Sequence, residues 1–75
     1  MRTFEINATW DDEAQVWVAE SEDVPGLATE APTQETLIEK LKVMIPELLE
    51  ANSGRRPMPE YVMHWHRETR LRVLV

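Results

Sequence analysis

The sequence contains no cysteine and only two glycines among its 75 residues. Without cysteine the chain has no disulfide to stabilise it, and a zinc site would have to use histidine and carboxylate ligands. Two glycines are too few for the glycine-rich loops that bind nucleotide phosphates, and no such motif is present. These absences exclude a disulfide-stapled domain and argue against a nucleotide-binding enzyme.

Long apolar runs are missing as well. No segment approaches the roughly 18 consecutive apolar residues of a membrane helix. The first ten residues, MRTFEINATW, alternate instead of forming the apolar block of a signal peptide. We therefore expect a cytoplasmic protein that makes no use of a membrane.

The small size of the chain predicts a single domain, residues 1–75, that is only marginally stable. Oligomerisation is the ordinary way for such a domain to gain stability when disulfides and metals are missing. We therefore expect a homodimer or a larger homo-oligomer.

The formal net charge is −6, and this charge is unevenly distributed. Residues 1–51 have a net charge of −9, and residues 52–75 have one of +3. An acidic body repels phosphate, which disfavours nucleic-acid binding by the whole surface. It complements a basic protein partner. The alternative is that the acidity serves solubility alone.

The first half of the chain shows the pattern of three strands. Residues 2–10 alternate between apolar and polar, and residues 15–20 resume the alternation after a polar turn, which predicts an antiparallel hairpin. Pro25-Gly26 predicts a type II turn, because proline presets one φ angle and glycine accepts a positive one. A short third strand is then expected at residues 27–30.

A single helix is predicted over residues 34–52. Thr33 is a suitable N-cap, and Glu35 lies in the first turn, where the helix dipole favours an anion. Pro46 removes one backbone hydrogen bond, so the helix either kinks there or ends there. The apolar side chains of one face are Leu37, Ile38, Leu41, Met44, Ile45, Leu48 and Leu49.

The last part of the chain is expected to return to the sheet. Residues 55–59 contain two prolines and predict a loop, and residues 61–75 are rich in β-forming residues. Fifteen residues are long for one strand, so we expect either a long strand with a bulge or two shorter strands. The fold class is therefore α+β in the order β-β-β-α-β: a three-stranded antiparallel sheet plus C-terminal strands, with one helix packed on the sheet.

Acidic residues are the first candidates for chemistry, in the groups 11–13 and 20–23 and on the polar helix face. Their places in turns favour an interpretation as solvent-facing charge. The alternative is a remnant nuclease that uses Asp11, Asp12 or Glu20 with a divalent cation. Because no serine or cysteine has the context of a nucleophile, we predict that the protein is not an enzyme and has no cofactor or metal.

The C-terminal part offers histidines and arginines. His64 and His66 should point to the same side of a strand, where they could supply two metal ligands, but the sequence nominates no third. We interpret them as surface or interface imidazoles. Arginines interleaved with aromatic residues can also bind single-stranded nucleic acid. Pairing with carboxylates, within the fold or across a dimer, is the favoured interpretation for Arg55, Arg56, Arg67, Arg70 and Arg72.

Tryptophan is the last candidate type. Trp10 falls on the apolar face of its strand and is expected in the core. Trp17 lies on the opposite face of its strand from Val16 and Val18, so one of these two sets faces outward unless both sides of the sheet are covered. Trp17 is therefore either an exposed interface anchor or a partly buried aromatic that packs on a neighbouring strand.

Several short runs resemble the N-terminal domain of HicB-like antitoxins over residues 2–52. The matching runs are Val16-Trp17-Val18-Ala19, Asp23-Val24-Pro25-Gly26-Leu27, Thr29-Glu30-Ala31-Pro32-Thr33, and Glu35 with the helix Leu37–Leu49. The resemblance implies a partial RNase H-like β-β-β-α-β unit without the catalytic carboxylates of the nuclease. It also implies dimers or larger oligomers, and a function: neutralising a small basic RNA-cleaving toxin, HicA, by direct binding.

The chain departs from the HicB pattern after Gly54, where about 20 residues remain. They are too few for both a last strand and the DNA-binding domain that HicB proteins often have, so operator binding is not expected. Our prediction is a protein-binding module with a basic toxin as partner. The alternatives are an orphan oligomer without a toxin and a nucleic-acid-binding module that uses the C-terminal arginines. The predicted contact residues are Trp17, Glu20, Glu22 and Asp23.

Overall fold

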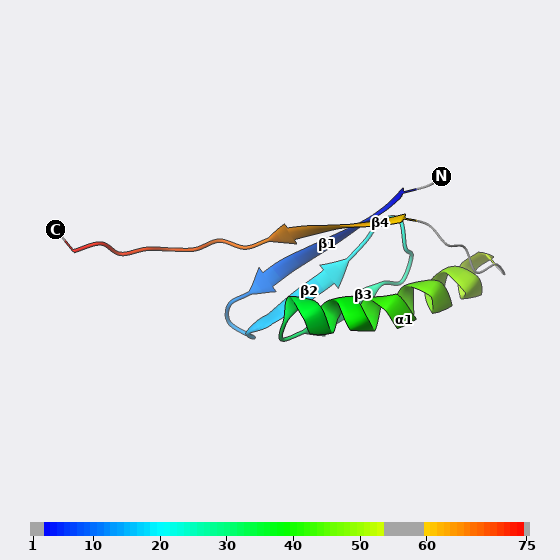
Figure 1. Ribbon diagram of the computed structural model, residues 1–75, viewed down its shortest axis with the longest axis horizontal. Helices are drawn as coiled ribbons and strands as arrows, with labels where there is room; N and C mark the ends of the chain where they lie inside the picture. The colour runs from blue at the N-terminus through cyan, green and yellow to red at the C-terminus, as the bar shows by residue number, and fades with distance from the viewer. Residues whose placement is uncertain (1–2, 54–59, 75) are drawn as a thin grey trace.

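The computed structural model describes residues 3–53 and 60–74 (Figure 1). The elements follow the order strand, strand, strand, helix, strand, which confirms the predicted α+β fold. Their bounds are β1 Thr3–Asp11, β2 Val16–Glu20, β3 Ala28–Ala31, α1 Gln34–Ser53 and β4 Glu60–His66. The loop predicted at residues 55–59 lies outside the described residues.

The strands form one mixed sheet in the order β3-β2-β1-β4. β1 pairs antiparallel with β2, which places Trp10 opposite Trp17, and β2 pairs antiparallel with β3. The three-stranded antiparallel part is therefore as predicted. β4 joins the free side of β1 in parallel, with Met63 opposite Ile6.

The Pro-Gly turn that follows β2 has the predicted geometry. The backbone N–H of Leu27 donates to the carbonyl oxygen of Val24 at 3.1 Å, and Gly26 has a φ of +85°. A positive φ at the third residue defines a type II turn. The turn inserts Val24 and Leu27 into the core, where they are 0% and 6% exposed.

The helix begins as predicted, because the N–H of Thr36 donates to Thr33 Oγ1 at 3.0 Å. It also continues through Pro46 to Ser53, so it does not end at the proline. Its buried side chains recur every four residues, which is one stripe along the helix. They are Leu37, Leu41, Ile45 and Leu49.

All of the core lies between α1 and one face of the sheet. The inward-facing side chains of β1, Phe4, Ile6 and Ala8, are at most 4% exposed. The helix lies across β2 and β3, and its Cα atoms do not come within 8 Å of those of β4. Among the described residues, no helix is long and apolar enough to cross a membrane.

The chain departs from the sequence prediction after His66. Residues 67–74 form no strand, so the strand predicted over residues 61–75 is wrong beyond β4. The reason is the absence of a neighbour. β4 pairs with β1 up to Thr9 opposite His66, and no strand of the described chain pairs with residues 67–74. We call residues 67–74 the C-terminal arm; it extends away from the body (Figure 1).

Candidate functional site

The face of the sheet that α1 does not cover is exposed and acidic, and we call it the open face. Alternation along the strands brings residues from all four strands to this face. They include Glu5, Asn7, Val18, Glu20, Glu30, His64 and His66, together with Val16 and Val62. Register places Val18 opposite Glu30, and Val18 is 38% exposed. An apolar side chain among carboxylates is a combination that suits contact with a protein.

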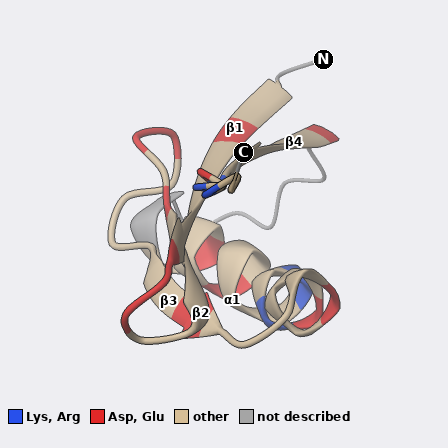
Figure 2. Cartoon of the chain, turned by 90° about the vertical axis from the view of Figure 1, so that its left-hand side faces the viewer, with Lys and Arg blue, Asp and Glu red and all other residues tan. Residues whose placement is uncertain are grey.

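An acidic recess of about 390 Å³ lies at one end of the open face. The connection after β2 supplies Glu20, Glu22 and Asp23, and β1 supplies Glu5. The structure therefore brings the three predicted acidic contact residues together and adds a fourth carboxylate. Figure 2 shows acidic residues on the strands and their connections as well as on the helix.

Asp23 has a structural role within this recess. β2 ends at Glu20, opposite Asn7, so the backbone groups of Glu5 have no partner strand on that side. Asp23 Oδ2 accepts a hydrogen bond from the N–H of Glu5 at 2.9 Å, and Ser21 Oγ donates to the carbonyl oxygen of Glu5 at 2.6 Å. These side chains replace the missing ladder bonds. Glu20 and Glu22 are exposed and remain available for contact.

The two histidines lie on the same side of β4, as predicted, and each approaches a polar residue of β1. His64 Nε2 lies 3.3 Å from Glu5 Oε1, and His66 Nε2 lies 3.3 Å from Asn7 Oδ1. No group of three or more histidine or acidic side chains could hold a metal ion within residues 3–53 and 60–74.

The structure does not bring the carboxylates of the nuclease alternative together. Asp11 Oδ1 accepts hydrogen bonds from the N–H groups of Glu13 and Ala14 at 3.1 Å each, and Asp12 Oδ1 accepts one from Trp10 Nε1 at 3.2 Å. Both residues shape the hairpin turn. Glu20 is paired with Asn7, four residues along β1 from Asp11, which is about 13 Å at the rise of a strand.

Trp17 is buried rather than displayed. Its side chain is 5% exposed and belongs to the core, so it offers almost no surface to a partner, and its expected role as a contact residue is not supported. Trp17 packs edge-to-face between Trp10 and Trp65, with ring centroids 5.3 Å and 5.1 Å away. The small buried Ala8, opposite Trp65 in the register, leaves room for these rings to meet.

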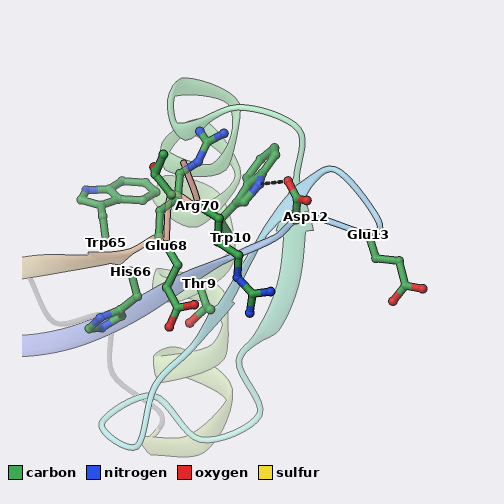
Figure 3. A pocket seen from close by; sticks show the side chains of 10 residues that line it. Thr9, Trp10, Asp12, Glu13, Trp65, His66, Glu68 and Arg70 are labelled. Atoms are coloured by element: carbon green, nitrogen blue, oxygen red, sulfur yellow. Dashed lines mark hydrogen bonds between the residues drawn. The ribbon is translucent and has the colours of Figure 1, made fainter. Parts of the chain in front are cut away.

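Trp10 and Trp65 are only partly buried, and an open hollow of about 1070 Å³ lies beside them (Figure 3). Trp10 is thus on the apolar face, as predicted, but at the rim of the core. The arm lines the other side of this hollow with Arg67, Glu68 and Arg70. The Arg67 guanidinium lies 4.6 Å from the centre of the Trp10 ring, a cation–π contact.

The expected pairing of the arginines with carboxylates is not seen within the described part of the chain. There, Arg67 contacts a ring, and Arg70 and Arg72 form no ion pair. Arg55 and Arg56 lie outside the described residues.

Several members of the open face were not among the predicted contact residues. Val18 lies beside Glu20 on β2, and strand register brings Glu5 and Glu30 near this pair. Strand parity already assigns Glu5 to the polar face of β1. Which residues of β3 stand beside Val18 depends on the geometry of the turn before β3.

Comparisons with known proteins agree with the fold. A family model described as a domain of unknown function, DUF1902, matches residues 3–75. The chain belongs to this family. No protein of curated function matches the sequence.

A solved structure is also similar to this DUF1902 chain. It is described as the crystal structure of hypothetical protein TTHA1013 from the extremely thermophilic bacterium Thermus thermophilus. The two sequences are 51% identical, the match covers 96% of this chain and 100% of that chain, and the TM-score is 0.73. Neither description names a function.

Proposed function

We propose that the protein is a cytoplasmic protein-binding module, and that its partner is a small basic protein. The observation that carries this proposal is the gathering of Glu5, Glu20, Glu22 and Asp23 in one recess beside the exposed Val18. Complementary charge would speed association with a basic partner and select against acidic ones.

The finer form of the proposal is that the chain is a HicB-like antitoxin and that its partner is an RNA-cleaving toxin like HicA. It rests on the resemblance of residues 2–52, in particular on the D-V-P-G-L run. That run builds the type II turn and, through Asp23, holds the acidic recess in place. Support comes also from the scattered nuclease carboxylates, because an antitoxin needs no cleavage site of its own.

Affinity capture from the native cytoplasm tests the proposal. The tagged chain is expected to retain one small basic protein in near-equal amount at moderate salt. Changing Glu20 and Glu22 together to glutamine should reduce its recovery severalfold, because both side chains are exposed and their charges are free to meet a partner.

The matched control changes Glu13 and Glu47 to glutamine. This variant has the same net charge, but its substitutions lie in the hairpin turn and on the helix, away from the recess. Equal loss of the partner in both variants would mean that the net charge of the chain, and not the recess, determines binding. Capture of nucleic acid that is lost at high salt would favour the alternative that uses the C-terminal arginines.

A further inference from the structure

The C-terminal arm exposes more apolar surface than any other described segment. Leu71, Val73 and Leu74 are 82%, 77% and 100% exposed. The arm runs outward from the end of β4, and the molecule is 59 Å long as a result (Figure 1). Exposed apolar side chains that follow one another along an extended segment mark a contact surface.

β4 offers an edge to which such a segment can bind. It is the last strand of the sheet, so its outer backbone groups face no neighbouring strand among the described residues. Tyr61 is 37% exposed, and Met63 and Trp65, which pack against the edge of the core, are only partly buried. A strand added to this edge would cover these three side chains.

We propose that the arm of one copy of this chain pairs antiparallel with β4 of a second copy, and that the exchange is reciprocal. In each copy, β4 and the arm form one continuous extended segment. A two-fold axis through this segment places the two copies antiparallel, so that each arm pairs with β4 of the other copy. The lengths are compatible, since the arm has eight residues, about 26 Å when extended, and can span the whole of β4, which has seven residues, about 23 Å.

The side-chain pattern of the arm fits this arrangement. In an extended chain Leu71 and Val73 have the same parity as Met63 and Trp65, and the two arginines Arg70 and Arg72 have the opposite parity. Antiparallel pairing in which opposite residue numbers add to an even value therefore places Leu71 and Val73 on the helix side of the sheet, the same side as Met63 and Trp65 of the second copy.

Charge favours a second copy as the occupant and also favours one register. The arm has a net charge of +2, from three arginines and Glu68, and the other residues have a net charge of −8. With the axis at His66, Arg72 lies opposite Glu60 of the second copy, and Leu71 lies opposite its Tyr61. An axis at Arg67 or at Glu68 would place two like charges opposite each other, which is destabilising.

The molar mass in solution tests this inference without any partner protein. The result is therefore independent of the proposed function. Sedimentation equilibrium should give twice the 8.8 kDa of one chain. Changing Leu71 and Val73 together to aspartate should raise the dissociation constant of the dimer by about a hundredfold or more, because two apolar side chains of the arm are replaced by charges on the side that pairs with Tyr61.

The control variant is Val43→Asp, which places an aspartate at a 60% exposed apolar residue of α1 and should leave the dimer intact. Far-ultraviolet circular dichroism checks that each variant is folded. A monomeric parent chain would overturn the inference, as would an unchanged dimer of the arm variant. An arm that becomes protected from hydrogen exchange only when a basic protein is added would assign it to that partner instead.

A disulfide trap tests the register. Since the sequence has no cysteine, Tyr61→Cys with Leu71→Cys introduces the only two thiols of the chain. A mild oxidant such as oxidised glutathione should link two copies covalently in high yield. The pair Val43→Cys with Tyr61→Cys should not form this link. A dimer that forms without the link from residue 61 to residue 71 would overturn the proposed pairing.

Discussion

Asp23 has a structural role inside the recess that we propose for a partner. Its carboxylate accepts a hydrogen bond from the backbone of Glu5, yet it also lines the recess proposed for a partner. A residue in this position is part-buried, and its loss leaves a strand N–H without an acceptor. Substitutions at Asp23 therefore need a stability measurement before a binding result can be interpreted.

Asp23→Ala is predicted to lower the free energy of unfolding by about 1–2 kcal/mol, because the N–H of Glu5 loses its acceptor. Asp23→Asn retains an oxygen acceptor and should cost less than half as much. Urea unfolding followed by tryptophan fluorescence measures both. Equal losses in the two variants would show that the charge, and not the hydrogen bond, stabilises the loop.

The fold changes the titration of Tyr61. Burial raises the pKa of its phenol above the ordinary value of 10.0, because the low-polarity surroundings disfavour the phenolate. A raised pKa in the folded state means that its contribution to stability is present below pH 10 and is lost as the pH rises through the folded value.

Stability is therefore predicted to fall more steeply above about pH 10 in the parent chain than in Tyr61→Phe. The measurement is the urea midpoint of both proteins at about pH 8 and about pH 11. The Phe4 ring, whose centroid lies 6.2 Å from that of Tyr61, should pack equally well against phenylalanine. Identical pH dependence in the two proteins would contradict the assignment.

At the scale of elements, local chemistry predicted most of the fold. The alternation in β1, the type II turn at Gly26 and the Thr33 cap each depend on two or three neighbouring residues, and each is confirmed. Two features depend on distant neighbours and could not be predicted this way. The burial of Trp17 follows from the position of α1, and the end of β4 follows from the absence of a strand beside the arm.

Pro46 is the clearest conflict between an element and its sequence, because α1 continues through it. Its missing N–H removes one helical hydrogen bond, and its ring crowds the preceding turn. Pro46→Ala is therefore predicted to raise the free energy of unfolding by about 1–3 kcal/mol. Thermal and urea unfolding measure the change. A destabilised variant would mean that the proline ring contributes packing that outweighs its cost.

At the scale of the whole molecule, charge and shape divide the chain into two surfaces. The open face is acidic and faces away from the helix. The arm is basic and extends from the end of β4 that lies farther from the recess. Sequence composition predicted this division of charge. The sequence also named Glu20 and Glu22 as candidate contact residues, and both line the recess, whereas Glu5 and Glu30 come near them through strand register.

The central claim is that the chain neutralises a basic RNA-cleaving partner, and the rate of RNA cleavage by the captured protein tests it most directly. The partner alone is predicted to cleave RNA, and an equal amount of this chain is predicted to stop the cleavage. The variant with Glu20 and Glu22 changed to glutamine should require a severalfold excess, whereas the Glu13 and Glu47 variant should act like the parent. A captured partner that cleaves no RNA, or that cleaves it equally well in the presence of the chain, would contradict the claim.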